Sequence, residues 1–116
     1  MADMDVIKVN DIWLSEAPDD IMYNEQRGVR ATIIIAINKV PPMVMTVPLT
    51  AEDDSLRFSR TIEIKKSNRN RLYADSIALI FQLRSLSTKR LIRKIGELED
   101  AYSESIKREI KSYLQF

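Results

Sequence analysis

The chain has 116 residues, of which 45% are hydrophobic and 30% charged, and its formal net charge at pH 7 is +1. This length and composition predict one globular domain, residues 1–116, with a core of its own. The lack of cysteine excludes disulfides and thiolate chemistry. The lack of histidine excludes Ser/His/Asp triads, histidine metal sites and the two-histidine acid/base pair of many ribonucleases.

The first half of the chain predicts three strands. A short apolar strand at 12–14 is followed by 15–28, a polar segment without an apolar period that we interpret as a long surface loop. Residues 30–38 are β-branched and apolar at successive positions, as in a central strand buried on both faces. Pro41 and Pro42 break this run, because proline removes a ladder donor, and 43–48 forms the partner strand.

The second half predicts shorter strands. Residues 61–65 alternate polar and apolar side chains, the period of a half-buried strand, and 67–71 is a basic, turn-like loop. Residues 75–81 form another strand, which continues toward 86 or bends away there. Residues 88–95 begin as a helical turn and end as a short strand.

The chain ends in an amphipathic helix for which Asp100 is the expected N-cap. Its apolar side chains recur at helical spacing, at Leu98, Tyr102, Ile106 and Ile110. Short strands in meander order followed by one helix predict a mainly β protein that closes into a small barrel.

Charge is unevenly distributed. Between Arg57 and Lys94 the basic residues far outnumber the acids Glu63 and Asp75, whereas the first 26 residues are acidic. A basic middle segment suits a polyanionic partner, but solvated faces of strands and loops explain it as well. The longest uncharged apolar stretch, 33–37, is too short for a membrane span, so no membrane contact and a cytoplasmic location are expected.

Three segments carry polar side chains where predicted strands begin or end. Residues 25–30 read Glu-Gln-Arg-Gly-Val-Arg and deliver Arg30 to the start of the buried strand, where its planar fork suits either a phosphate or a surface carboxylate. Thr50 follows Val-Pro-Leu at the end of the next strand, where its hydroxyl either starts a turn or donates to a phosphoryl oxygen. The third segment runs from Asp75-Ser76 into Phe81-Gln82-Leu83-Arg84.

In this order the three segments resemble the MazF/PemK family of toxin endoribonucleases, over most of the chain from Asp11 onward. The resemblance implies an SH3-like β-barrel of the CcdB/PemK-like toxin fold, with Arg30 and Thr50 as catalytic residues. Glu25, the carboxylate of the matched loop, is expected to orient Arg30 or to share its proton transfers. The expected RNA-binding residues are Asn24, Gln26, Arg27, Gly28, Phe81, Gln82 and Arg84.

The resemblance also implies the reaction and the partners. The 2′-hydroxyl of single-stranded RNA attacks the adjacent phosphate and leaves a cyclic phosphate, with no metal and no cofactor. Family members form twofold dimers, and a cognate antitoxin, expected here to be acidic, covers the RNA groove.

Phe81 is a departure from the family, which often has an acid at this position. The residue that acts as general base is therefore not identified. Phe81 either stacks on a nucleobase of the RNA or belongs to the core. Two other functions stay open: a CcdB-like poison of DNA gyrase that cuts nothing, and a non-catalytic SH3-like module that binds RNA or a peptide.

Overall fold

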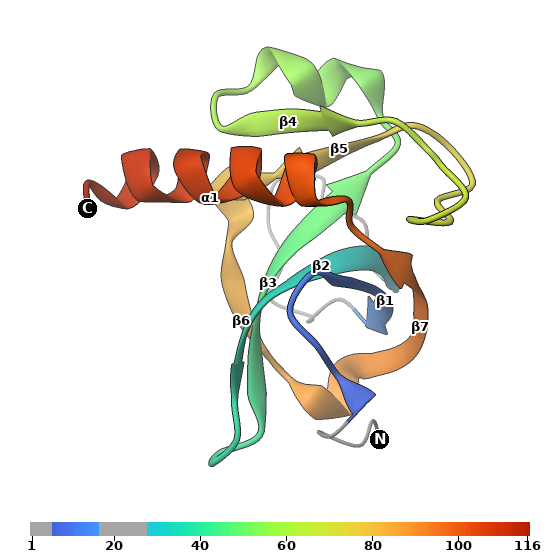
Figure 1. The fold of residues 1–116 in the computed structure, drawn as a ribbon, viewed down its shortest axis with the longest axis vertical. Helices are drawn as coiled ribbons and strands as arrows, with labels where there is room; N and C mark the ends of the chain where they lie inside the picture. The colour runs from blue at the N-terminus through green and yellow to red at the C-terminus, as the bar shows by residue number, and fades with distance from the viewer. Residues whose placement is uncertain (1–5, 17–27) are drawn as a thin grey trace.

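The computed structural model describes residues 6–16 and 28–116. The predicted class, mainly β with a C-terminal helix, is confirmed (Figure 1). The strands are β1 (Asp11–Glu16), β2 (Val29–Asn38), β3 (Met43–Thr50), β4 (Thr61–Ile64), β5 (Ser76–Leu79), β6 (Arg84–Ser87) and β7 (Leu91–Glu97), and the helix is α1 (Asp100–Leu114). Short 3₁₀ turns lie at Asp53–Arg57, Ile80–Gln82 and Thr88–Arg90.

The sheet is open rather than closed, which corrects the predicted barrel closure. Its order is β4-β5-β3-β2-β1-β7, with β6 paired to β3 outside this path. β6 and β7 follow each other in the chain and would have to pair to close a barrel, but no ladder joins them within the described residues. The 3₁₀ turn Thr88–Arg90 separates them, and the Thr88 amide donates to the Pro42 carbonyl instead.

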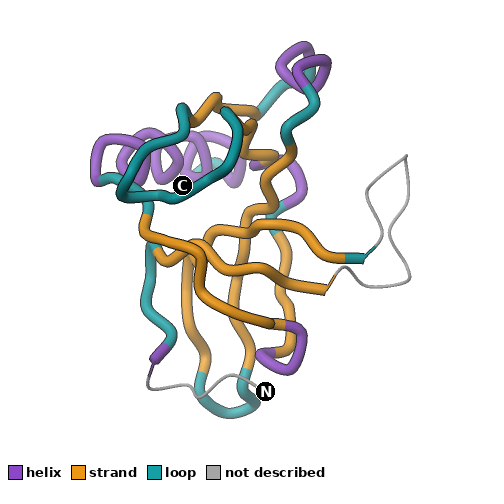
Figure 2. The backbone as a smooth tube through the Cα atoms, turned by 90° about the vertical axis from the view of Figure 1, so that its right-hand side faces the viewer, coloured by secondary structure: helices purple, strands orange, loops and turns teal. Residues whose placement is uncertain are grey.

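β3 connects the two parts of the molecule. Residues 43–46 pair with β6, whereas Leu49 and Thr50 pair with β5, which in turn pairs with β4. Figures 1 and 2 show the hairpin of β4 and β5 together with α1 at one end of the molecule and the β2–β3 turn at the other. Meander order therefore holds for β1 to β3 but not for the whole sheet.

Strand β2 supplies both apolar clusters of the core. Ile33 packs in a cluster with Val47 and Ile106, under α1, and Ile34 packs in a second cluster with Trp13. Neighbouring side chains of a strand point to opposite faces, so a strand that is apolar at consecutive positions is buried on both sides. This confirms the expectation for β2.

Several element boundaries differ from the sequence predictions. β1 continues to Glu16, into the segment predicted as loop, and β5 ends at Leu79, where a 3₁₀ turn begins. The N-cap of α1 is Glu99 rather than Asp100, and its side chain makes no capping bond. None of the helices in the described part of the chain is long and apolar enough to cross a membrane.

Candidate functional site

A cavity of 290 Å³ lies where β2 begins and β3 ends. This volume is near the lower end of the range of about 300–1,000 Å³ found for small-molecule pockets. It has room for one small group, such as a phosphodiester linkage, rather than for several nucleotides. We call it the Arg30–Thr50 cavity; its described lining is Leu14, Val29, Arg30, Ala31, Leu49, Thr50, Ala51, Arg71, Leu72, Tyr73, Ser76, Arg93 and Ile95.

Arg30 and Thr50 meet in this cavity because of the β2–β3 register. Thr32 lies opposite Pro48, so continuing the antiparallel ladder by two residues brings Arg30 opposite Thr50. Opposed residues share one face of a sheet. Both side chains are recessed, since Arg30 is 8% and Thr50 7% exposed.

The Thr50 hydroxyl accepts a hydrogen bond within a turn, and its hydrogen is still available for donation. Its hydroxyl oxygen accepts a hydrogen bond from the Glu52 amide at 3.3 Å, which starts the turn after β3. Within the described residues its hydroxyl hydrogen donates to no group, and a hydroxyl accepts and donates at once. The turn role and a donor role toward an anion in the cavity are therefore compatible.

The charge of the lining is of one sign. Arg30, Arg71 and Arg93 contribute three guanidinium groups, and no carboxylate is among the described lining residues. Elsewhere in the described chain, some basic side chains form ion pairs: Lys94 with Asp11 and Glu97, Lys65 with Glu63 and Asp75, Arg60 with Glu109, and Arg69 with Asp100. Arg30 is buried, whereas Arg71 and Arg93 are exposed. A cavity lined by three guanidiniums favours an anion, and the fork geometry of arginine suits phosphate oxygens.

Two irregularities of β7 accompany Arg93 in this lining. Opposite β1, the ladder passes from Gly96 to Lys94 and from Arg93 to Leu91, so that one residue of β7 is unpaired in each step, Ile95 and Ile92. Bulges bend a strand and redirect its side chains. Arg93 and Ile95 face the Arg30–Thr50 cavity, while Lys94 pairs with Asp11 and Glu97.

The loop between β4 and β5, residues 65–75, forms the other wall, and Asn70 anchors it. Asn70 is fully buried; its amide oxygen accepts from the Ser67 and Leu72 amides, and its amide nitrogen donates to the Lys65 carbonyl and to Glu99. Burial alone would raise the pKa of Glu99, but the hydrogen bonds from Ser67 and Asn70 outweigh it and hold that pKa below its ordinary value.

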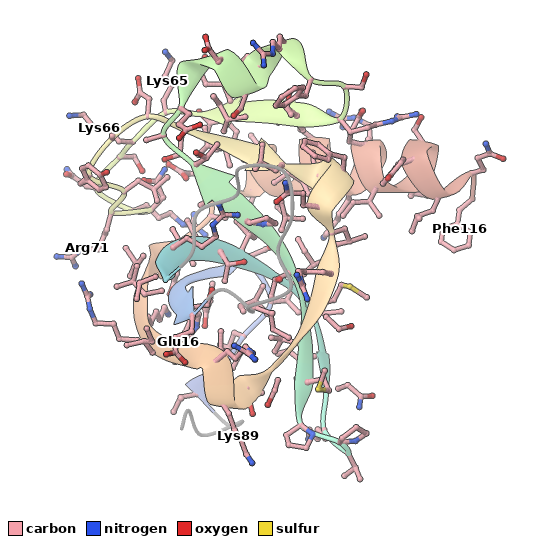
Figure 3. All side chains as sticks on the ribbon, turned by 180° about the vertical axis from the view of Figure 1, so that it is seen from behind. Glu16, Lys65, Lys66, Arg71, Lys89 and Phe116 are labelled. Atoms are coloured by element: carbon pink, nitrogen blue, oxygen red, sulfur yellow. The ribbon has the colours of Figure 1, made fainter. Side chains whose placement is uncertain are left out.

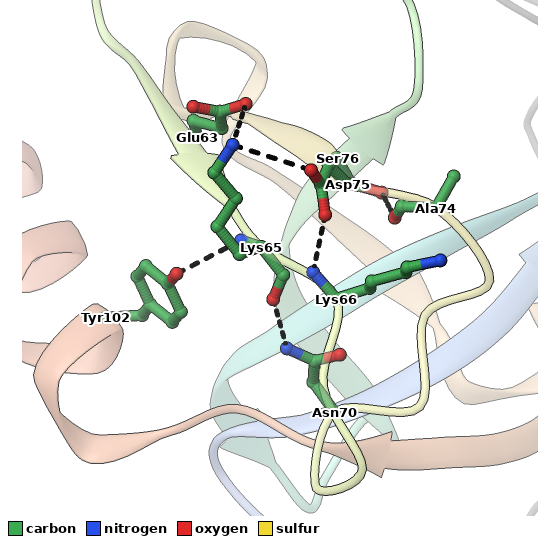
Figure 4. A network of polar contacts seen from close by, with 8 residues as sticks. All are labelled: Glu63, Lys65, Lys66, Asn70, Ala74, Asp75, Ser76 and Tyr102. Atoms are coloured by element: carbon green, nitrogen blue, oxygen red, sulfur yellow. Dashed lines mark hydrogen bonds and ion pairs between the residues drawn. The ribbon is translucent and has the colours of Figure 1, made fainter.

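The stem of the β4–β5 loop is also fastened (Figure 4). The Asp75 carboxylate accepts from the Lys66 amide at 2.9 Å and from the Lys65 ammonium at 3.5 Å. The bond from the Lys66 amide is the main reason that the pKa of Asp75 lies below its ordinary value. On the other side, the Lys65 amide donates to the Tyr102 hydroxyl of α1. The loop is thus bound at both ends and at Asn70.

The residues predicted from sequence fall into three groups. Arg30 and Thr50 line the cavity, and Gly28 precedes β2 with a φ of +91°, a left-handed conformation that favours glycine. Phe81, Gln82 and Arg84 are absent from its described lining. Asn24, Glu25, Gln26 and Arg27 lie outside the described residues.

Phe81 has an aromatic partner. Its half-buried ring meets the ring of Phe58 edge to face, with centroids 5.8 Å apart. Arg84 belongs to β6, opposite Thr46 of β3. The third sequence segment is therefore divided: Ser76 lines the cavity, whereas Phe81, Gln82 and Arg84 lie outside its described lining.

Sequence reasoning missed Arg71, Tyr73 and Arg93, which belong to the lining. The only sequence feature that pointed to Arg71 and Arg93 was the basic middle segment, which contains many other basic residues. No group of three or more acidic side chains that could hold a metal ion occurs in the described part of the chain.

Comparison with known proteins identifies a family. The family model described as PemK-like, MazF-like toxin of type II toxin–antitoxin system matches residues 8–114. Among solved structures, the chain is similar to MazF from Deinococcus radiodurans, with a TM-score of 0.76 and 16% identity over 96% of this chain and 98% of that one.

Two further structures share the fold. Toxin MazF-mt6 of Mycobacterium tuberculosis has a TM-score of 0.68 and 16% identity, over 91% of this chain and 97% of that one. An endoribonuclease in complex with its cognate antitoxin, from a mycobacterial species, has a TM-score of 0.68 and 15% identity, over 93% and 94%. The TM-scores show that the chain shares the fold of these three structures.

Proposed function

The chain belongs to the PemK-like, MazF-like toxins of type II toxin–antitoxin systems, and from this premise we propose that it is an endoribonuclease that cleaves single-stranded RNA. The main support is that Arg30 and Thr50 line one recessed cavity together with two further guanidinium groups and no described carboxylate. Such a site favours a phosphodiester and the extra negative charge that develops when it is attacked.

The proposed reaction is an internal transfer of the phosphoryl group. The RNA 2′-oxygen forms a bond to the adjacent phosphorus, and the bond from phosphorus to the 5′-oxygen breaks. The 2′-hydroxyl loses a proton and the leaving 5′-oxygen gains one, so no water or other reactant is consumed. The products are a 2′,3′-cyclic phosphate and a 5′-hydroxyl.

Arg30 and Thr50 have distinct roles in this proposal. The Arg30 guanidinium and the Thr50 hydroxyl donate to the non-bridging oxygens, where negative charge grows during the attack. Because a guanidinium holds its protons firmly, the proton of the 2′-hydroxyl needs another acceptor or a shared one. We assign to Glu25 the orientation of Arg30 and a share in these proton transfers.

The partners follow from the same proposal. Single-stranded RNA is the substrate, because bases must be unstacked to be read and a 2′-hydroxyl is the nucleophile. A cognate acidic antitoxin blocks the basic site in this proposal, because opposite charges attract; the mycobacterial endoribonuclease is in complex with its cognate antitoxin. We further propose a homodimer and a cytoplasmic location.

One incubation tests the reaction. Purified protein with a long single-stranded RNA in EDTA should give discrete fragments that end in cyclic phosphate. A single 2′-deoxy substitution at a mapped cut should stop cleavage there and leave other cuts intact. Retained cleavage at the 2′-deoxy position would rule out the cyclising route.

The same incubation separates the alternatives. A non-catalytic module would bind the RNA and leave it whole. Phe81 favours this alternative, because the family often has an acid at that position. A CcdB-like toxin would leave RNA whole and instead trap cleaved DNA in an assay with DNA gyrase.

A further inference from the structure

The β4–β5 loop is a fixed element that presents Arg71 and Tyr73 at the rim of the Arg30–Thr50 cavity. The Arg71 amide donates to the Ser67 carbonyl, and the neighbouring Asn70 is held by the four hydrogen bonds described above. The Glu97 amide of β7 donates to the Arg69 carbonyl. The backbone of residues 69–72 is thus held by bonds within the loop and by contacts with β7 and with Glu99 before α1.

Arg71 has an unusual backbone conformation. Its φ is +58°, in the left-handed region that favours glycine and asparagine over other residues. Arg60 has a similar φ of +61°, but its side chain pairs with Glu109 and lies over the ring of Tyr113. Within the described residues, the Arg71 guanidinium has no carboxylate or hydroxyl partner. The side-chain contacts of Arg60 account for an arginine at its left-handed position. No such contacts in the described part of the chain account for the arginine at position 71.

The exposed position of the Tyr73 ring also has no explanation in the packing of the described residues. It is 90% exposed although it belongs to the cavity lining. An exposed ring beside a cationic cavity is the arrangement that binds single-stranded nucleic acid, because any base can stack on it.

A second hollow continues the surface beyond the cavity. It is lined by Ser67, Asn68, Arg71 and Leu72, so that Arg71 and Leu72 belong to both hollows. Arg71 therefore stands between the site of the proposed reaction and a neighbouring polar depression. A strand that leaves the cavity in this direction has to pass its guanidinium.

From these observations we infer that Arg71 and Tyr73 form a subsite for the nucleotide next to the scissile one. Arg71 holds that nucleotide's phosphate, and the ring of Tyr73 stacks on a base. This inference rests on the proposed function, because it takes RNA as the molecule in the cavity. It adds a binding platform on the β4–β5 loop, apart from the sequence segments that predicted the site.

The test measures the affinity of a single-stranded RNA that carries a 2′-deoxy nucleotide at the mapped cut, at several salt concentrations. Arg71→Gly should lower the slope of log K against log salt by about 0.7, the value for one phosphate contact of a single strand, and weaken binding about fivefold at 0.1 M salt. Glycine suits a positive φ, so this variant should melt at or above the wild-type temperature.

Tyr73 gives an independent arm. Tyr73→Ala should weaken RNA binding by between about fivefold and a hundredfold, the range for one stacked base, without changing the salt slope. Tyr73→Phe keeps the ring and should bind as wild type does.

Two matched controls lie elsewhere on the surface. Arg108→Ala removes an equal charge from α1, and Phe116→Ala removes another ring that is 90% exposed. Figure 3 shows Arg71 and Phe116 on opposite sides of the molecule. Neither control should change RNA affinity or salt slope.

The outcomes separate the two proposals. If wild type cleaves RNA while Arg71→Gly and Tyr73→Ala both bind like wild type, the subsite is wrong and the proposed function stands. If the controls weaken binding as much as these variants do, the effect is nonspecific and the subsite is also wrong. If wild type neither binds nor cleaves RNA, both proposals fail.

Discussion

At the scale of single residues, Thr50 combines a structural and a proposed catalytic task in one hydroxyl. Thr50→Val keeps the shape, leaves the Glu52 amide without its acceptor and removes the proposed donor. The expected cost is about 1 kcal/mol of the free energy of unfolding. The single-turnover cleavage rate should fall by about a hundredfold to a thousandfold, the effect of losing one such donor.

Thr50→Ser is the control for that prediction, because it keeps the hydroxyl. Its cleavage rate and melting temperature should stay near those of wild type. A Thr50→Val protein that cleaves RNA as fast as Thr50→Ser would remove Thr50 from the mechanism.

The close packing of the β4–β5 loop on β7 requires a glycine at position 96. A Cβ there would lie 2.4 Å from the Asn70 carbonyl oxygen and 2.8 Å from that of Arg69, closer than real Cβ contacts and against backbone that must move. Gly96→Ala should lower the free energy of unfolding by about 1–3 kcal/mol. It should also speed hydrogen exchange at the Arg71 amide, as the β4–β5 loop is pushed off β7.

The control for Gly96 is Gly28→Ala. A Cβ at Gly28 meets no atom of the described residues within 4 Å, but its φ of +91° is strained for alanine. This variant should also be destabilised, yet exchange at the Arg71 amide should stay unchanged relative to other loop amides. Equal exchange at Arg71 in both variants would contradict the docking of the loop on Gly96.

At the scale of elements, the junction of β7 and α1 holds the β4–β5 loop through Glu99. The pKa of Glu99 lies below its ordinary value of 4.5, so the folded state favours the carboxylate. This contribution to stability is complete above the ordinary pKa and is lost as the pH falls through the lowered one. Asp75, whose pKa lies below 3.8, acts in the same direction.

Acid titration of Glu99→Gln checks this contribution. At pH 6 the variant should be less stable than wild type by about 1–2 kcal/mol, because Ser67 and Asn70 lose a charged partner. The difference should shrink as melting temperatures are followed from about pH 5 down to about pH 3. Glu104→Gln, on the exposed face of α1, should follow wild type throughout. A difference that stays constant with pH would contradict the role of the Glu99 charge.

Elements with a strong local pattern could be predicted from the sequence. β2 was evident from consecutive β-branched residues, and α1 from apolar residues at helical spacing. The N-cap was misplaced because the Glu99 side chain is held by Ser67 and Asn70, about thirty positions earlier in the chain. β5 was predicted too long because Ile80 and Phe81 turn away to donate their amides to the Arg60 carbonyl.

At the scale of the whole molecule, the sequence motifs predicted the meeting of Arg30 and Thr50 but not the rest of the cavity. Those two residues lie on adjacent strands of one hairpin, so a local register brings them together. Arg71 and Arg93 reach the same cavity through the docked loop and the bulged β7, which depend on contacts between distant segments. Such contacts leave no local pattern to read.

Barrel closure was overpredicted for a related reason. Alternating strands and a terminal helix fit both an open and a closed sheet, and the choice depends on how β6 and β7 are joined. The 3₁₀ turn at Thr88–Arg90 and the bond from Thr88 to Pro42 decide it.

The central claim is that the Arg30–Thr50 cavity cleaves RNA, and the rate of Arg30→Lys tests it most directly. This variant keeps the positive charge and removes the planar fork. Its single-turnover rate should fall by at least about a hundredfold, while affinity for the 2′-deoxy RNA changes only a few-fold. Cleavage by Arg30→Lys at the wild-type rate, with the same cyclic phosphate ends, would contradict the account.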